Sequence, residues 1–358
     1  MYYLDQNISL EVMTLTEYIS THATPPQNLK VFFVYNESMH NIVTIGGGSG
    51  HSQVLIALKD IPGVAITGIC PSTDSGGSTG ILRTEYEGSG YTGDLTKCIA
   101  ALCNNAVIAQ ALMYRYENGP LDSHSVKNIL FHALEKVSST EQALQALGEM
   151  THIAPHRVIP VTTEKTELCA TLILGNTIVG ETNIDYLASN PLWNPEHHAI
   201  SDIFLKPEVS ASPIALSAII EADYIIVCPG DLYSSIIPTL LPEGMQSAVR
   251  TSRAKIIIIL NIMTKKGETD DYTAQDFLET IENRLGRKAD YVLCNNAVIP
   301  DEILAIYSLE SKVEFDTLES IDERKLILVP LAQVTSDGQV VSDPKVISET
   351  IRLILKNV

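Results

Sequence analysis

Short apolar runs alternate with segments of helical periodicity from residue 41 onward. Seven runs of five to eight residues read as strands: 41–45, 64–69, 168–174, 224–228, 255–262, 290–294 and 325–329. Because they are apolar at successive positions, both faces of each strand must be covered, as in a parallel sheet with helices on its two sides. The pattern predicts an α/β protein with a doubly wound, mostly parallel sheet.

The segments between these runs predict helices and two local departures from simple alternation. Helical periodicity covers 52–58, 95–116, 125–136, 141–150, 214–221, 274–285 and 344–355. No strand interrupts the stretch from about 95 to 150, which predicts a helical lobe. Residues of about 160–205 form short extended segments with turns, which predicts a small β excursion. We expect an N-terminal arm or helix at 1–40, followed by one main domain at 41–358.

Composition and charge narrow the class of protein. The 358 residues are 45% hydrophobic and 19% charged, which is typical of a globular chain. The formal net charge of −19 argues against nucleic acid or an anionic membrane as partner. The sequence has no apolar run of about 18 residues and no leader pattern, so we expect a cytoplasmic protein. Its six cysteines lack a Cys-x-x-Cys pair, and we expect them to be buried apolar side chains without chemistry.

The first candidate site is a glycine-rich turn between the strand at 41–45 and the next helix. It consists of Gly46, Gly47, Gly48, Ser49 and Gly50. Glycines allow a ligand to approach the backbone, and the following helix N-terminus attracts anions. The turn lacks the third glycine of a dinucleotide fingerprint and the lysine of a P-loop. It indicates a phosphate site, with tight packing as the alternative.

A second polar turn follows the strand at 64–69, where open α/β sheets bind their ligands. Its backbone and hydroxyl groups come from Gly76, Gly77, Ser78, Thr79 and Gly80. Asp74 could accept a bond from a ribose hydroxyl or hold Mg²⁺. The alternative is an Asx-turn in which Asp74 only closes its own loop.

Three further segments are weaker candidates. Asp94 stands at the start of a helix, where an N-cap is the usual role of an aspartate. Polar residues also follow two of the central strands, at 229–235 and 261–270. A loop can be polar for solubility alone, so these segments gain weight only in combination.

The order of these segments resembles the CofD-like superfamily. The motifs are GGGSG, TDSGGSTGILR, GDLTKCIAAL, TEKTELCATL followed by VGET, PGDLYSSIIPTLLPEGMQSAV and NIMTKKGETDDY, spanning about residues 41–345. The superfamily comprises 2-phospho-L-lactate transferases and bacterial gluconeogenesis factors. The phrases LYSSI and MT with GET are closer to the gluconeogenesis factors. The resemblance implies a Rossmann-like domain.

The resemblance also implies a function. Gluconeogenesis factors are regarded as cytoplasmic regulators that bind UDP-sugars such as UDP-N-acetylglucosamine and influence carbon metabolism, cell-wall precursor supply and cell shape. The alternative is an Mg²⁺-dependent transferase that moves a phospholactyl group from a guanylylated donor to a deazaflavin. Both bind a nucleotide diphosphate. A dinucleotide oxidoreductase is a third possibility, weakened by the missing glycine. We expect a homodimer by analogy with the family.

Carried over by position, the resemblance implies a set of site residues. The phosphates of the nucleotide would lie near Gly46–Gly50 and Gly76–Gly80. Asp74 and Asp94 become the candidate catalytic residues, and Asp74 the candidate metal ligand. Further binding residues would be Arg83, Gly230, Tyr233, Ser234, Asn261 and Thr264.

The chain departs from the usual family pattern at Ser75, Ile81, Thr96, Cys228 and Asp231. The family usually has a second acid in place of Ser75 and arginines in place of Ile81 and Thr96. It usually has glycine in place of Cys228 and serine in place of Asp231. Missing guanidiniums remove donors to a diphosphate, and Asp231 adds a repelling charge. Cations that could compensate are Arg83, Lys97, Lys265 and Lys266. The departures argue against catalysis more strongly than against binding.

Overall fold

The chain forms two compact units, Met1–Met39 and His40–Val358. The computed structural model describes residues 12–13, 32–33, 39–87, 92–189, 193–307, 310–314, 318 and 325–356. In the first unit β1 (Val12–Met13) pairs in parallel with β2 (Phe32–Phe33). The rest of the expected N-terminal arm or helix lies outside the described residues.

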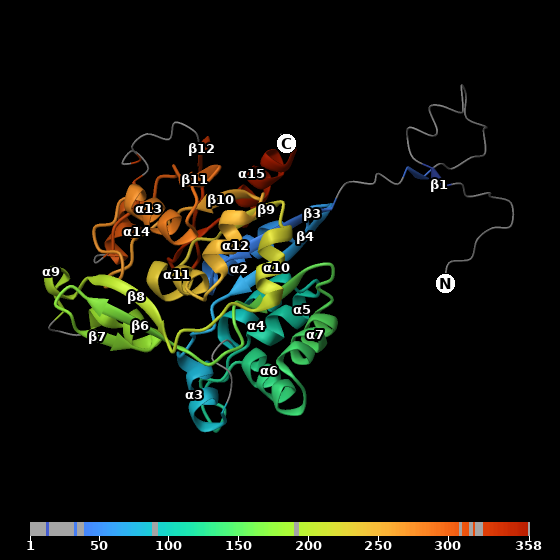
Figure 1. The fold of residues 1–358 in the computed structure, drawn as a ribbon, viewed down its shortest axis with the longest axis horizontal. Coiled ribbons are helices and arrows are strands. Elements are labelled where there is room, and N and C mark those ends of the chain that lie inside the picture. The colour runs from blue at the N-terminus through green and yellow to red at the C-terminus, as the bar shows by residue number, and fades with distance from the viewer. Residues whose placement is uncertain are drawn as a thin grey trace. The chain divides into compact units, whose positions relative to one another are not determined.

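A seven-stranded parallel sheet is the centre of the second unit, as predicted (Figure 1). Its strands are β3 (His40–Ile45), β4 (Val64–Cys70), β5 (Arg157–Pro160), β9 (Tyr224–Val227), β10 (Lys255–Ile259), β11 (Tyr291–Asn295) and β12 (Lys325–Val329). The spatial order is β12-β11-β10-β9-β3-β4-β5, and each neighbouring pair is parallel. When the strands of this sheet are numbered 1 to 7 along the chain, their spatial order is 3-2-1-4-5-6-7. This is the 3-2-1-4-5-6 order of a Rossmann-like fold with one strand, β12, added at the edge.

Helices cover both faces of this sheet because its strands are apolar on both faces. In β9, Tyr224 and Ile226 belong to one buried cluster, and Ile225 and Val227 to the other. Side chains of α2 (Gly48–Leu58), α4 (Thr92–Leu102) and α15 (Pro344–Lys356) complete the first cluster. Side chains of α10 (Pro213–Glu221), α12 (Met245–Thr251) and α13 (Ala274–Leu285) complete the second.

The helical lobe contains four helices, which lie together below β4 in the view of Figure 1. They are α4, α5 (Ala106–Met113), α6 (Val126–Val137) and α7 (Thr140–Thr151). The single helix expected at 95–116 is therefore divided into α4 and α5. The break is at Asn105, whose side chain caps α5 by accepting bonds from the N–H groups of Val107 and Ile108 at 3.0 and 3.1 Å.

The β excursion is a separate antiparallel sheet. It contains β6 (Glu167–Leu172), β7 (Thr177–Val179) and β8 (Ile200–Lys206), in the order β7-β6-β8. The run at 168–174, which was expected among the parallel strands, lies here instead. The run ends early because the chain turns back at Gly175, whose φ is +89°, to form the hairpin of β6 and β7. The short helices α8 (Glu181–Asp185), η1 (Leu187–Ser189) and α9 (Pro195–His198) lie between β7 and β8.

The remaining elements shape the loops at the sheet's edge. They are α3 (Gly77–Glu85), η2 (Leu232–Ile236), α11 (Ile237–Leu240), α14 (Asp301–Ile306), β13 (Ala332–Val334) and β14 (Val340–Ser342). The second glycine turn was expected to be an open loop, but from Gly77 onward it is the first turn of α3. Across the described ranges, the helices are all too short or too polar to cross a bilayer.

Candidate functional site

The two predicted glycine turns lie where the winding of the sheet reverses. β3 and β9 are neighbours, but the chain continues from β3 into α2 on one face and from β9 into η2 and α11 on the other. Such a switch point opens a crevice at the carboxyl ends of the strands. A Cβ added to Gly50 would lie 2.0 Å from the carbonyl oxygen of Pro229, so the loops after β3 and β9 touch here.

The first turn offers an anion site at the start of α2. Gly48 has a φ of +64° and is the first residue of the helix. The N–H groups of Ser49 and Gly50 follow it in the first turn, where a helix provides no backbone acceptor and has its positive dipole end. Nζ of Lys97 donates to Oγ of Ser49 at 2.7 Å, which adds a full positive charge. A phosphate group would be stabilised at this position.

Asp94 joins the two parts of the site. Its Oδ1 accepts a hydrogen bond from the N–H of Gly48 at 2.9 Å, and a Cβ on Gly47 would meet its Oδ2 at 2.2 Å. Asp94 lies in the first turn of α4, where an N-cap was expected, yet the helix end that it binds is that of α2. Burial, and then the charge of Asp74, raises the pKa of Asp94 to about 7.

Asp74 lies on the other side of the same turn of α4. Its Oδ1 accepts from the N–H of Gly76 at 3.0 Å, so the Asx-turn is present. A Cβ on Gly93 would lie 1.9 Å from Oδ2 of Asp74, which requires a glycine there. Burial raises the pKa of Asp74. Burial also lowers the pKa of the nearby Lys127 to about 8, against the opposing effect of Asp74 and Asp94.

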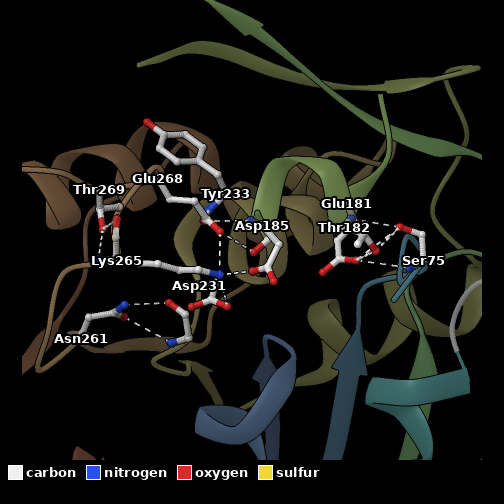
Figure 2. Close-up of polar contacts among 12 residues, drawn as sticks. Ser75, Glu181, Thr182, Asp185, Asp231, Tyr233, Asn261, Lys265, Glu268 and Thr269 are labelled. Carbon is white, nitrogen blue, oxygen red and sulfur yellow. Dashed lines mark hydrogen bonds and ion pairs between the residues drawn. The ribbon is translucent and has the colours of Figure 1, made fainter. Parts of the chain in front are cut away.

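Glu181 is a third carboxylate at this position, and the sequence analysis missed it. It is the first residue of α8, and its Oε2 accepts from the N–H of Ser75 at 3.3 Å and from its Oγ at 3.4 Å (Figure 2). Thr182 also donates its N–H to Oγ of Ser75 at 3.0 Å. Burial, and then the charge of Asp74, raises the pKa of Glu181 to about 8. The VGET motif contains Glu181 and was the signal that could have identified it.

We call Asp74, Asp94 and Glu181 the acid site. The pKa of each carboxyl is raised, and the charges of the neighbouring carboxylates contribute to this in Asp94 and Glu181. Carboxylate oxygens are the ligands that Mg²⁺ prefers, and a bound cation would reverse these shifts. The three carboxylates therefore have the chemistry of ligands for a hard divalent cation, but their oxygens do not all lie within 4.8 Å of one another, so they would have to move closer together to share one ion.

A second charged cluster surrounds Lys265, at the other end of α8 (Figure 2). Its Nζ binds Asp185, and it lies 2.8 Å from Oδ2 of Asp231 and 3.0 Å from Oε1 of Glu268. Burial lowers the pKa of Lys265, but the charges of Glu268 and Asp231 outweigh it and the pKa is raised. The charge of Asp231, which was expected to repel a diphosphate, is thus partly neutralised by Lys265.

Glu268 fixes the turn that follows β9. Its side chain is buried and accepts from the N–H groups of Tyr233 and Ser234 at 2.9 and 3.2 Å, and from Oγ of Ser234 at 2.8 Å. The hydroxyl groups of Tyr233 and Tyr272 are 2.7 Å apart. Tyr233 and Ser234, which were predicted to bind the ligand, therefore use their N–H and hydroxyl groups for contacts within the protein. They lie in η2, a π-helix, a form that recurs at functional sites.

Asn261 holds the neighbouring turn in the same way (Figure 2). Its Oδ1 accepts from the N–H of Gly230 at 3.2 Å, and its Nδ2 donates to the oxygen of Gly230 at 2.7 Å. Thr264 is buried, and its Oγ1 accepts from the N–H of Ser311 at 2.7 Å. The structure thus assigns both side chains a role in shaping loops.

A cavity of about 320 Å³ opens between these loops and the first glycine turn. We call it the switch-point pocket. Five of the predicted binding residues line it: Ser49, Gly50, Gly230, Asn261 and Thr264. Gln53, Met263, Tyr307 and Glu310 contribute larger side chains to its wall.

The other predicted residues lie toward α3. Ser78 Oγ is 3.0 Å from Nδ1 of His124, and Thr79 Oγ1 accepts from Asn128 at 3.3 Å. The N–H of Gly80 donates to the oxygen of Gly76 at 3.0 Å within the helical turn. These groups stabilise the second turn from inside.

The cations expected to compensate for the missing arginines are dispersed. Arg83 donates to the oxygen of Thr166 at 3.4 Å and lines a separate cavity of about 540 Å³ with Lys136 and Lys165. Lys266 lies 5.4 Å above the ring of Trp193. Of the four, Lys97 is the cation in contact with the first glycine turn.

Comparison with known proteins identifies the family. The sequence model of the family described as 2-phospho-L-lactate transferase CofD matches residues 42–332. The gluconeogenesis factor of Bacillus subtilis is 35% identical over 287 residues, covering 78% of this chain and 86% of the relative. That of Halalkalibacterium halodurans is 33% identical over 293 residues, covering 80% and 85%.

A solved structure agrees with these matches. A crystal structure of a UPF0052 family member from Bacillus halodurans superposes with a TM-score of 0.77 at 30% identity, covering 87% of this chain and 99% of that one. The shared fold, the matched length and the named relatives lead to one assignment. The chain belongs to the CofD family, and within it to the gluconeogenesis factors.

Proposed function

We propose that this protein is a cytoplasmic regulator that binds a nucleotide-sugar, of the UDP-N-acetylglucosamine type, in the crevice at the switch point. The observation that carries the proposal is the hydrogen bond from Gly48 to Asp94, with Lys97 on Ser49 beside it. These contacts join an anion-binding helix end to a group of acids at one edge of the sheet. A diphosphate linked to a nucleoside on one side and a sugar on the other matches that arrangement.

Each part of such a ligand has a complementary region of the crevice. The diphosphate fits the N-terminus of α2 and the ammonium group of Lys97. The nucleoside fits the switch-point pocket, whose 320 Å³ is in the range of small-ligand sites. The sugar would then extend toward Asp74 and Glu181, whose carboxylates can accept bonds from hydroxyl groups.

A divalent cation is part of the proposal. Asp94 and a phosphate would both occupy the positive end of α2, where two anions repel each other. Mg²⁺ bound by Asp74, Asp94 and Glu181 would supply the positive charge that lets both remain. Protonation of Asp94, whose pKa is about 7, would relieve the same repulsion in part.

The transferase is the second candidate, and the acid site is the observation that favours it. Three carboxylates beside a phosphate site are a usual setting for metal-assisted group transfer. Transfer also needs cations that neutralise the moving group. Lys265 is held by three carboxylates and Lys266 lies over Trp193, so Lys97 is the cation at the turn. This distribution supports binding more than turnover.

Calorimetric titration with UDP-N-acetylglucosamine, with and without Mg²⁺, tests the proposal. Lys97→Gln should weaken binding about tenfold to a hundredfold, because a charge-assisted bond contributes about 1.5–3 kcal/mol. The matched control is Lys288→Gln, an exposed lysine just before β11 and therefore at the opposite edge of the sheet. Absence of heat and of thermal stabilisation with UDP- and GDP-linked ligands at millimolar concentration would contradict the proposal.

A second assay separates the two candidates. The folded protein is incubated with a guanylylated phospholactate, a deazaflavin acceptor and Mg²⁺. Formation of a phospholactyl product that is lost in Asp74→Asn would establish the enzyme. We also propose a homodimer by family analogy, which light scattering of the purified protein would test.

A further inference from the structure

Directly beneath the first glycine turn, two thiols and an imidazole come together. His51 lies on α2, Cys70 ends β4 and Cys98 lies on α4, and all three are fully buried. The two sulfurs are 3.6 Å apart, and Nδ1 of His51 is 3.5 Å from Sγ of Cys98 and 3.9 Å from Sγ of Cys70. Among the described residues this is one of two places where three potential metal-ligand atoms cluster so closely.

These distances are those of one face of a small coordination tetrahedron. Bond lengths of about 2.3 Å to sulfur and about 2.0–2.1 Å to nitrogen place tetrahedral ligands about 3.8 Å (S to S) and about 3.6 Å (S to N) apart. The three observed separations agree with these values to within about 0.3 Å. Two thiols and an imidazole that only pack against one another need not show all three of these separations at once.

The imidazole of His51 is held in place at both ring nitrogens. Its Nε2 is 2.8 Å from Oγ1 of Thr44, a buried side chain of β3. Nδ1 lies 2.7 Å from the carbonyl oxygen of Gly46, which can only accept, so Nδ1 carries the proton here and Nε2 accepts from the hydroxyl of Thr44. A metal ion bound at Nδ1 would replace that proton, and Nε2 would then donate to Thr44. A second-shell acceptor of this kind fixes the tautomer of ligating histidines.

We propose that His51, Cys70 and Cys98 bind a thiophilic divalent cation of the zinc class, which would replace the proton on Nδ1 of His51. Two thiolates and an imidazole are the donors that Zn²⁺ prefers, whereas Mg²⁺ prefers the oxygens of the acid site. The closed, buried position makes the ion structural. It would tie β4, α2 and α4 together under the phosphate turn, whether or not that turn binds a nucleotide.

The test begins with the intact protein and needs no variant. Apoprotein prepared with a chelator is titrated with Co²⁺, which gives intense thiolate charge-transfer and tetrahedral d–d absorption when bound by sulfur. We expect these bands to saturate at one ion per chain and to disappear on addition of Zn²⁺. X-ray absorption of the zinc form should show two sulfur ligands at about 2.3 Å. Zn²⁺ at equimolar concentration should raise the melting temperature.

Variants then locate the ion. Cys70→Ser and Cys98→Ser should each lose the cobalt bands, with zinc affinity reduced at least tenfold. The matched control is Cys294→Ser, a buried cysteine in β11 that lies outside the cluster. Circular dichroism checks that each variant is folded, and the spectra of the unmodified protein decide the question if one is not.

Three results would overturn the proposal. The first is an absence of cobalt bands and of bound zinc in the folded, reduced protein. The second is bands of unchanged strength in both serine variants, which would place the ion elsewhere. The third is a thiol count in denaturant two below the six cysteines of the sequence, with Cys70 and Cys98 recovered as a disulfide.

Discussion

The carboxylate of Asp94 accepts a 2.9 Å hydrogen bond from the backbone of Gly48, which precedes it by 46 residues. An acidic side chain thus occupies the helix end at which an anionic ligand is expected. The ionisation of Asp94 and the occupancy of the crevice must therefore influence each other. Two of the predictions below use this coupling.

Asp94→Asn should stabilise the protein at pH 8 and change its stability progressively less as the pH falls toward 4. The folded pKa of about 7 lies above the unfolded value of 3.8, so the protonated carboxyl stabilises the fold. That stabilisation is fully present below about pH 3.8 and is lost as the pH rises from there through about 7. Asparagine keeps an oxygen for Gly48 and has no charge to bury. We expect a melting temperature a few degrees above that of the wild type at pH 8, measured with chelator present.

Glu117→Gln, on an exposed carboxylate of the helical lobe, is the control for the Asp94 variant. Its melting temperature should follow that of the wild type across the same pH range. If Asp94→Asn also parallels the wild type from pH 5 to 8, Asp94 does not titrate as the geometry requires.

Binding of Mg²⁺ at the acid site should release protons near neutral pH. The pKa of Asp94 is about 7 and that of Glu181 about 8, so part of each carboxyl is protonated before the cation arrives. The measured heat of binding should therefore depend on the ionisation enthalpy of the buffer. Glu181→Gln should reduce both the number of protons released and the affinity. Equal heats in phosphate-free buffers of different enthalpy would be inconsistent with a cation held by these acids.

Gly50→Ala should disrupt the contact between the loops after β3 and β9. Its Cβ would lie 2.0 Å from the oxygen of Pro229, so the backbone must move, which costs about 2–3 kcal/mol of unfolding free energy. The control is Gly148→Ala in α7, where the new Cβ would make an ordinary 3.5 Å contact with Ile153. That change should add up to about 1 kcal/mol of stability. Urea denaturation of both variants measures the difference, and equal effects would show that the loops do not touch.

Lys265→Met should cost about 3–5 kcal/mol, because it leaves buried Glu268 without its cation. The loss should shrink at low pH, where Glu268 becomes protonated, and in the double variant with Glu268→Gln. Lys255→Met is the control: this lysine pairs with Asp290 at 2.8 Å but is about half exposed, so its loss should cost less than about 1 kcal/mol. Similar urea midpoints for the two lysine variants would contradict the description of Lys265 as the centre of its cluster.

The pattern of apolar positions predicted most of the fold. The helix expected at 274–285 is present as Ala274–Leu285, and six of the seven apolar runs lie in the parallel sheet. The strand of the parallel sheet that was not predicted, β5, has four residues that begin with Arg157 and end with Pro160, which is too short and too mixed for a periodic signal. The run at 168–174 was correctly predicted to be a strand, but its apolar pattern did not show which sheet it joins. The pairing partners of a strand depend on turns, here the one at Gly175.

The sequence predicted the turns of the candidate site, but not the contacts that distant residues make with those turns. Glycines after strands identified where the backbone opens. The contact of Ser75 with Glu181 joins residues 106 positions apart, and no local pattern contains it. The polar loop at 229–235 likewise gave no indication that Glu268 uses the N–H groups of Tyr233 and Ser234. The cysteines were predicted to be buried, and all six are, but the grouping of two of them around His51 depends on three separate elements.

Helix α8 has only five residues, Glu181–Asp185, so its two ends are about 6 Å apart. Glu181 contacts the turn that carries Asp74, and Asp185 contacts Lys265 beyond β10. A rigid segment this short cannot shift at one end alone. A cation or sugar that displaces Glu181 would therefore also displace Asp185, and with it the ion pairs that Lys265 makes with Asp231 and Glu268.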